Sequence, residues 1–210
     1  MLVWINGPFG GGKTQTAFEI KRRLPGSIVC DPETVGFGLN RMVPRELRGD
    51  FQDFPAWRQG VFEVLDRVVA GHPGPVIAPM TVVEPDYFAE TVGRLRERGH
   101  DVRHFTLLAE RETVLRRLSE RGVGQAVRWL RGTEQALRRE SFAVRKLDRC
   151  LEQLVAPEFA EHLWTDRIPV PRVAERIAAS AGLPLGPAVG GPVRRRAQWA
   201  WTGLTHIRFD

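Results

Sequence analysis

Short apolar runs alternate with amphipathic segments along most of the chain. A short apolar run that ends at a turn is typical of a buried strand, and apolar residues at helical spacing are typical of a helix that packs on a core. The predicted strands cover residues 2–6, 27–30, 75–80, 102–108 and 161–164. The predicted helices cover residues 14–24, 34–48, 55–70, 86–98, 111–120, 141–155 and 171–181. This alternation predicts an α/β fold, a parallel sheet with helices on both faces.

The pattern divides the chain into one domain and a short tail. The sequence has 210 residues, of which 42% are hydrophobic, and this suffices for one domain with a sizeable core, at residues 1–183. Residues 184–192 are rich in proline and glycine and are predicted to be a linker. In residues 193–210 an apolar stripe at helical spacing lies opposite a face with three consecutive arginines. We expect this tail to bind an anionic membrane surface; the alternatives are docking on the domain or one face of a homodimer.

Charge is unevenly distributed along the chain. There are 31 lysines and arginines against 25 acidic residues, a net charge of +6. Residues 111–149 carry eleven cations and five anions, and residues 193–210 carry four cations and one anion, so the remainder is slightly acidic. A nucleic-acid binder would have a broader basic surface, and no nucleic-acid partner is expected. Each basic segment therefore needs its own explanation.

Other broad classes of protein are disfavoured by simple features. The two cysteines form no C-x-x-C pair, which disfavours a disulfide scaffold or a zinc site. No apolar run reaches the length of a membrane-spanning helix. The amino terminus has no basic segment before its apolar run, unlike a signal peptide. We therefore expect a cytoplasmic protein that associates with the membrane only peripherally.

The most specific motif stands between the first predicted strand and the first predicted helix. Residues 7–14 match G-x-x-x-x-G-K-T, whose backbone N–H groups converge on phosphates at the start of a helix. Lys13 would reach the β- and γ-phosphates and the hydroxyl of Thr14 would bind Mg²⁺, so ATP and Mg²⁺ are the expected cofactors. The alternative is a glycine turn that happens to precede a lysine. The residues predicted to bind the nucleotide are Gly7, Pro8, Phe9, Gly10, Gly11, Gly12, Lys13, Thr14 and Gln15.

A catalytic carboxylate is predicted after the second strand. Asp31 follows this strand, and the carboxyl ends of parallel strands share one edge of the sheet, which predicts that it lies near the phosphate motif. There it could take a proton from a substrate hydroxyl. It could also cap the next helix, and the two roles are compatible. Neither the third nor the fourth predicted strand ends in aspartate, so a conventional second Mg²⁺ ligand is missing.

The arginine-rich segment is interpreted as a lid over the triphosphate, at about residues 121–140. Guanidinium groups suit the charge that spreads over phosphoryl oxygens during transfer. Arg117 and Arg121, one helical turn apart, are the residues predicted to stabilise the moving phosphoryl group. The alternative is a solvated helical face on which these arginines pair with glutamates.

An aromatic segment, residues 51–58, precedes the third predicted helix. Phe51 and Trp57 could form a stacking wall for an acceptor, with Gln52 and Arg58 as polar contacts. Aromatic residues at the start of a helix can equally belong to the core.

Several longer strings, spread from end to end, resemble one family, the tunicamycin-resistance ATP-binding proteins. The resemblance implies a three-layer P-loop NTPase fold like that of nucleotide and shikimate kinases, ATP binding, resistance to tunicamycin and a membrane-associated form. Similar antibiotic kinases have a catalytic aspartate where Asp31 stands. Glu33 and Thr81, which lie in two of these strings, are expected to contact the substrate. The strings are Val3-Trp4-Ile5-Asn6-Gly7, Lys13-Thr14-Gln15-Thr16, Asp31-Pro32-Glu33, Asp50-Phe51-Gln52, Pro79-Met80-Thr81, His104-Phe105-Thr106 and Leu204-Thr205-His206-Ile207-Arg208.

These features together predict a Mg-ATP-dependent phosphotransferase that modifies a hydroxyl of tunicamycin or of a related nucleoside antibiotic. One alternative is a protein that sequesters the drug at the membrane with the help of ATP but does not modify it. The other is a metabolic kinase for a nucleoside or a sugar.

Overall fold

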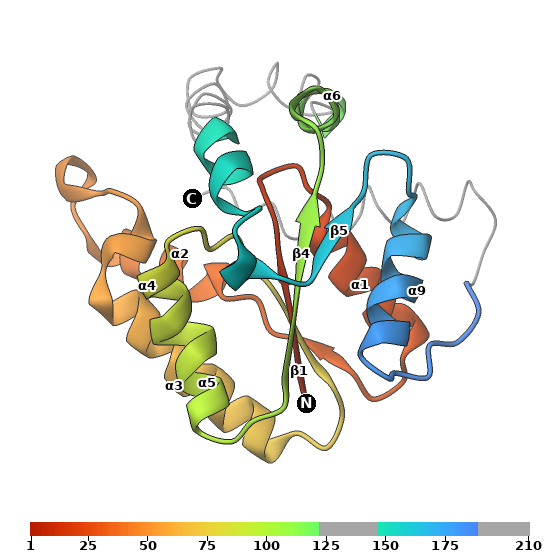
Figure 1. Cartoon of the computed structure of the whole chain (residues 1–210). Coiled ribbons are helices and arrows are strands. Elements are labelled where there is room, and N and C mark those ends of the chain that lie inside the picture. The colour runs from red at the N-terminus through yellow and green to blue at the C-terminus, as the bar shows by residue number, and fades with distance from the viewer. Residues whose placement is uncertain (122–146, 189–210) are drawn as a thin grey trace, which may run out of the picture.

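A parallel sheet of five strands lies at the centre of the computed structural model, which describes residues 1–121 and 147–188 (Figure 1). The strands are β1 (Leu2–Asn6), β2 (Ile28–Val29), β3 (Val76–Pro79), β4 (Val102–Leu108) and β5 (His162–Trp164). Their order in the sheet is β2-β3-β1-β4-β5. Strand β1 is therefore central, with Val3 beside Ile77 of β3 on one side and Arg103 of β4 on the other.

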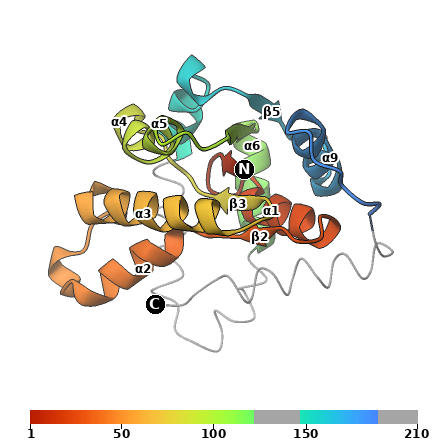
Figure 2. The same ribbon diagram turned by 90° about the horizontal axis from the view of Figure 1, so that it is seen from below.

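Helices connect these strands and cover both faces of the sheet. Figure 2, seen from below, shows α2 lying along α3 on one side of the molecule. Short 3₁₀ turns occur at Arg45–Leu47, Phe51–Asp53 and Pro157–Phe159, and residues 147–153 are helical. The helices are α1 (Lys13–Arg23), α2 (Glu33–Met42), α3 (Pro55–Gly71), α4 (Pro85–Phe88), a π-helical turn (Ala89–Gly93), α5 (Arg94–Glu97), α6 (Arg111–Arg121) and α9 (Val170–Ser180).

Two apolar cores, one on each face of the sheet, make the fold three-layered. The side chains of β1 alternate between them, because successive residues of a strand point to opposite faces. Leu2 and Trp4 pack with α3, α4 and α5, whereas Val3 and Ile5 pack with α1 and α9. All four side chains are buried, as expected for a central strand of a sheet covered on both faces.

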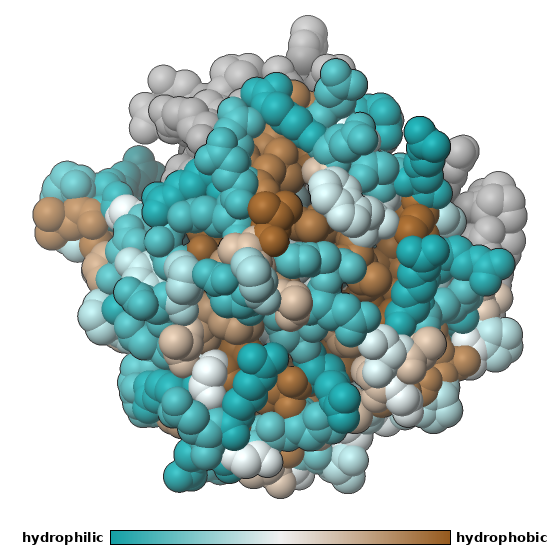
Figure 3. All heavy atoms as spheres, viewed as in Figure 1, coloured by the Kyte–Doolittle hydropathy of each residue, from teal (hydrophilic) through white to brown (hydrophobic). Residues whose placement is uncertain are grey.

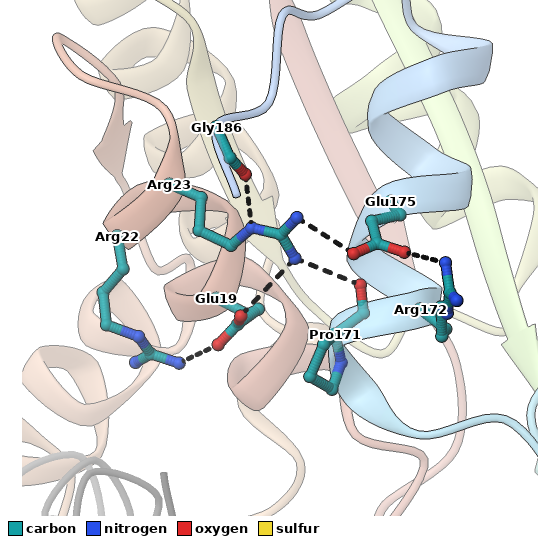
Figure 4. Close-up of polar contacts among 7 residues, drawn as sticks. All are labelled: Glu19, Arg22, Arg23, Pro171, Arg172, Glu175 and Gly186. Atoms are coloured by element: carbon teal, nitrogen blue, oxygen red, sulfur yellow. Dashed lines mark hydrogen bonds and ion pairs between the residues drawn. The ribbon is translucent and has the colours of Figure 1, made fainter. Parts of the chain in front are cut away.

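A buried arginine holds the carboxyl-terminal part of the domain against α1. Arg23 donates hydrogen bonds to the carbonyl of Gly186 at 2.8 Å and to the carboxylate of Glu175 at 3.0 Å, and it also pairs with Glu19 (Figure 4). These contacts bring α1, α9 and the segment after α9 together. The helix that follows the phosphate motif is thereby fixed to the last helix that the structure describes.

The predicted strands are all present, and most predicted helices lie within a few residues of their expected bounds. The predicted helix 34–48 is an exception, because it stops at Met42. The next residue, Val43, is extended with φ −85° and ψ 130°, the conformation that a following proline imposes, and Pro44 then leads into a separate 3₁₀ turn. Residues 43–50 form a projection beside α2 (Figure 1).

Exposed apolar side chains occur at the end of α2 and within this projection. Met42 is 83% exposed and Leu47 is 68% exposed, and Figure 3 shows apolar atoms at this edge of the molecule. None of the helices in the described parts of the chain is long and apolar enough to cross a membrane. Four parts of the predicted chain lie outside the described residues: residues 122–140 of the lid, residues 141–146 of the helix 141–155, residues 189–192 of the linker, and the tail.

Candidate nucleotide-binding site

The candidate site lies where the parallel strands end. Strand β1 runs into the glycine-rich motif, called here the phosphate loop (residues 7–14), and β2 runs into Asp31. Strand β3 runs into Thr81 and β5 into Thr165. Since the strands are parallel, these segments meet at one edge of the sheet, the position of ligand crevices in open α/β folds.

The phosphate loop has the backbone conformation that its glycines allow. Gly7, Gly10 and Gly12 have positive φ angles of 146°, 80° and 93°. The N–H of Gly11 donates to the carbonyl of Pro8 at 2.9 Å and closes a turn, and helix α1 then begins at Lys13. Backbone N–H groups at a helix start following such a turn form a concave site for anions. The motif therefore occurs in the structural context that phosphate binding requires.

Gly7 is the most constrained residue of this loop. A Cβ placed on it would lie 2.7 Å from the carbonyl oxygen of Leu107 on β4, closer than real Cβ atoms approach. The loop is covered from the other side by α6, because a Cβ on Gly10 would lie 3.0 Å from the side chain of Leu118. The loop is therefore enclosed between β4 and α6.

Lys13 is buried and folded back over the loop. Its ammonium group donates to the carbonyl of Gly7 at 3.0 Å and to that of Pro8 at 3.1 Å. The same nitrogen lies 5.8 Å from the centre of the Phe9 ring. The only positive side chain of the loop is thus held by the carbonyl oxygens of the first two loop residues.

Asn6 and Thr81 support the loop from below. The side-chain oxygen of Asn6 accepts hydrogen bonds from the N–H of Gly7 at 2.8 Å and of Val82 at 3.0 Å, and its amide donates to the Val82 carbonyl at 2.8 Å. The hydroxyl of Thr81 donates to the Gly7 carbonyl at 2.8 Å. Both side chains are buried, and Thr81, which is predicted to contact substrate, contacts the loop in this structure. Asn6 was not among the predicted site residues. The sequence feature that could have identified it is a polar side chain at the end of an otherwise apolar strand.

Thr14 is the residue predicted to bind Mg²⁺ through its hydroxyl. Thr14 lies half-buried in the first turn of α1, next to Lys13. Mg²⁺ commonly takes few protein ligands and completes its shell with water and phosphate oxygens. Strand β3, beside β1, is followed by Met80 and Thr81 and not by a carboxylate. Within residues 1–121 and 147–188 no group of three potential metal-ligating side chains occurs.

Asp31 caps helix α2. Its carboxylate accepts a hydrogen bond from the N–H of Glu33 at 3.0 Å, at the start of the helix. Strand β3 lies between β2 and β1, so Asp31 and the phosphate loop share the edge of the sheet but follow strands that are not neighbours. The pKa of the neighbouring Cys30 is raised, first by burial and then by the charge of Asp31. Asp31 and Glu33 are both half-buried at this edge.

The aromatic segment is divided between the core and the surface. Trp57 is 0% exposed, and its indole N–H donates to the carbonyl of Pro32 at 3.1 Å. It therefore has no exposed face on which an acceptor could stack, and the interpretation as core holds for this residue. Phe51 is half-buried, packs on Gly36 of α2, and lies 5.5 Å from Trp57 between ring centres. Gln52 is also half-buried.

Arg58 holds this segment in place. It donates to the carbonyl of Gln52 at 2.6 Å and to the carboxylate of Glu90 at 2.7 Å, and its guanidinium lies 4.3 Å from the centre of the Tyr87 ring. The arginine is 8% exposed. Two of its guanidinium nitrogens thus bind the protein itself, which gives Arg58 a structural role; its predicted contact with substrate stays a prediction.

Arg117 joins α6 to the segment after β5. Its guanidinium donates to the hydroxyl of Thr165 at 3.0 Å and to the carbonyl of the same residue at 2.6 Å. Nearby, the N–H of Glu110 donates to the carboxylate of Asp166 at 2.8 Å. Both contacts lie at the edge of the sheet where the phosphate loop lies. The side chain of Arg121 lies outside the described residues.

Comparisons with known proteins agree on the fold. Residues 2–142 match the family model described as an AAA domain. The tunicamycin resistance protein of Deinococcus radiodurans is 32% identical, with a TM-score of 0.69; the match covers 89% of this chain and 98% of that one. A sugar kinase from Janibacter sp. is 18% identical, with a TM-score of 0.59 and coverages of 87% and 95%. Shikimate kinase from Bacteroides thetaiotaomicron is 15% identical, with a TM-score of 0.55 and coverages of 87% and 99%. No curated protein matches the chain.

Proposed function

The chain belongs to the AAA domain family and to the family of the tunicamycin resistance proteins, and from that premise we propose that it is a Mg-ATP-dependent phosphotransferase acting on tunicamycin or a related nucleoside antibiotic. A P-loop fold of the kinase type is the established part of this statement. The proposal adds the phosphate donor, the acceptor and the transfer between them.

The observation that carries the proposal is the conformation of the phosphate loop. Three glycines with positive φ angles turn the chain into the first turn of α1, where Lys13 and Thr14 stand side by side. Such a turn presents several N–H groups and the positive end of a helix to a single anion. A triphosphate is the ligand that uses all of these groups together.

Each remaining residue has a chemical role in this proposal. Lys13 would leave its carbonyl partners and bind the β- and γ-phosphates, and Thr14 would bind Mg²⁺. Asp31 would take the proton of the acceptor hydroxyl. The hydroxyl oxygen of the acceptor would then form a bond to the γ-phosphorus of ATP, while the bond between that phosphorus and the bridging oxygen breaks and ADP leaves. Arg117 and Arg121 would face the charge of the moving phosphoryl group. Glu33, Phe51 and Gln52 remain the proposed contacts with the acceptor.

Transfer is tested by incubating the full chain with tunicamycin, Mg²⁺ and ATP labelled at the γ-phosphate. A gain of one phosphoryl group in the mass of the drug, together with label on the drug, is the expected result. Lys13→Ala is the negative control for the phosphate loop, and it should remove both the transfer and the binding of ATP. An unmodified drug, under conditions in which the protein protects cells, would exclude phosphoryl transfer.

A drug-binding protein without transfer is the second candidate, and the site contains a reason to consider it. Asp31 already accepts a hydrogen bond from the backbone of α2, and no carboxylate directly follows β3. Under this alternative the protein would bind the drug only with ATP present and would release it unchanged. Protection of cells by Asp31→Asn at the level of the natural protein would favour this alternative.

We also propose that residues 1–183 form the kinase-like domain, with a lid at about residues 121–140, and that residues 193–210 bind anionic membrane through a linker at 184–192. The spacing of apolar residues and the arginines of the tail support this proposal. Truncation after Pro192 should move the protein from the membrane pellet to the supernatant. An unchanged distribution would contradict the role of the tail, and the mass of the truncated protein in solution would show whether the tail forms a dimer.

A further inference from the structure

The carbonyl group of Gly7 accepts two hydrogen bonds, one from a residue that must move on ligand binding and one from a residue that can stay. Lys13 donates to it at 3.0 Å and Thr81 donates to it at 2.8 Å. We propose that Thr81 is a positioning residue that keeps this carbonyl hydrogen-bonded when Lys13 turns away to a phosphate. This role of Thr81 rests on the proposed binding of ATP, because it matters only when a phosphate draws Lys13 away. One of the two tests below is made on the protein without nucleotide.

Lys13 has to give up protein contacts before it can bind a phosphate. Two carbonyl groups of the loop, those of Gly7 and Pro8, accept from its ammonium group. An ammonium group has three donors in a compact head, and a phosphate on the N–H side of the loop competes with these carbonyls for them. Binding an anion therefore exchanges carbonyl partners for phosphate oxygens.

The exchange would leave a carbonyl without a partner if Thr81 were absent. Gly7 is buried. A buried carbonyl that has no hydrogen-bond donor raises the free energy of the state in which it is unpaired, here the state with Lys13 on the phosphate. Thr81 is 2% exposed and follows directly from β3 through Met80, so its hydroxyl has little freedom to leave. Its contact with Gly7 persists while the lysine moves.

Asn6 keeps Thr81 in register with the loop. Its side chain bonds both the N–H and the carbonyl of Val82, the residue after Thr81, and also the N–H of Gly7. The first peptide of the loop and the end of β3 are thus joined into one unit by two buried side chains, Asn6 and Thr81. This unit can hold the shape of the loop in both positions of Lys13.

The proposal predicts a defect that appears in binding more than in folding. Thr81→Val should raise the Kd for Mg-ATP about tenfold, because the unpaired carbonyl arises only after Lys13 has left. Thr81→Ser keeps a hydroxyl and should bind like the natural protein. Thr91→Val is the matched control, since Thr91 is also buried and donates to a carbonyl, that of Tyr87 at 2.7 Å, but lies away from the loop. It should lower the thermal midpoint without changing the Kd.

A double-mutant cycle tests the same idea on the unliganded protein. With Lys13 present, Thr81→Val leaves the Gly7 carbonyl its other donor and should lower the thermal midpoint only slightly. In a Lys13→Met background the same change leaves that carbonyl with neither donor, and the midpoint should fall by about 3 °C more. This excess is the coupling between the two donors.

The outcomes separate the two proposals. If the natural protein binds no ATP, the proposed function fails, and the cycle in the thermal midpoint still decides whether Thr81 and Lys13 share the carbonyl. If the natural protein binds ATP but Thr81→Val binds equally well and the cycle is additive, the role of Thr81 is overturned and the proposed function stands.

Discussion

The phosphate loop and the aromatic segment lie at the same end of the sheet but are constructed differently. In the phosphate loop, glycines set the course of the backbone, and the buried side chains of Asn6 and Thr81 hold it through hydrogen bonds to Gly7. In the aromatic segment, the side chains of Trp57 and Arg58 turn inward and hold the segment to its neighbours. A surface made of backbone can be recognised from its glycines, whereas a surface made of side chains depends on which of them face outward.

The largest effect is expected from removing the anchor of the aromatic segment. Trp57→Ala should lower the free energy of unfolding by about 4 kcal/mol, because it empties a large buried site and removes the hydrogen bond to Pro32. Urea unfolding measures this loss. Val64→Ala, on the exposed side of the same helix, is the control and should cost less than about 0.5 kcal/mol. Similar losses at the two positions would mean that Trp57 is not an anchor.

Two alanine substitutions should show how strictly the phosphate loop is enclosed. Gly7→Ala places a Cβ 2.7 Å from the Leu107 carbonyl at a positive φ, so we expect a loss of about 3 kcal/mol of stability and loss of ATP binding. Gly12→Ala has a positive φ but nothing within 4 Å of its Cβ, so the strain alone should cost about 1 kcal/mol. Calorimetry and nucleotide titration compare the two. Equal losses would show that the contact with β4 does not matter.

The core around β4 should be sensitive to acid. His104 packs against Phe88 and lies 2.9 Å from the carbonyl of Ala160, and its pKa falls to about 4, chiefly because of burial. In the unfolded chain His104 takes up a proton near pH 6.5, whereas in the folded protein it does so only near pH 4. The free energy of unfolding is therefore unaffected by this group above pH 6.5 and decreases as the pH falls from 6.5 toward 4. Between pH 7 and pH 5 this amounts to about 2 kcal/mol.

His104→Asn is the variant that isolates this effect, since an amide can still donate to Ala160 but does not titrate in this range. Urea unfolding at several pH values should show a shallower decline toward pH 5 than in the natural protein. If both proteins decline equally, His104 is not the group responsible.

A smaller effect than that of Trp57→Ala or Gly7→Ala is expected from removing the polar support of the aromatic segment. Arg58→Met removes the donors to Gln52 and Glu90 while keeping much of the aliphatic volume, and should cost about 1.5 kcal/mol. Arg67→Met, at an exposed position on the same helix, should have little effect on urea unfolding. If Arg58 contacts the acceptor, as its sequence context predicted, Arg58→Met would instead weaken drug binding and leave stability unchanged.

Much of the fold could be predicted because the spacing of apolar residues along the chain matches the positions that each strand and helix buries. Residues 2–6 and 102–108 are strands in the structure with the predicted bounds. The predicted helix 34–48 was too long, because the restriction that Pro44 places on Val43 outweighs helical spacing. The order of the strands was not predicted, and it is this order that places β3 between Asp31 and the phosphate loop.

The sequence by itself determined where the phosphate loop lies and which residues form it, because the motif is local: its glycines set the turn of the backbone, and its lysine and threonine follow at the start of the next helix. The tertiary structure alone decided the direction of the neighbouring side chains. Trp57 and Arg58 turn inward because Pro32, Gln52 and Glu90 offer partners there, and Thr81 supports the loop because β3 pairs with β1. Pro32 and Glu90 are far from Trp57 and Arg58 in the sequence, and Gln52 lies close to Arg58 only because the chain turns between them. These contacts therefore exist only once the chain has folded.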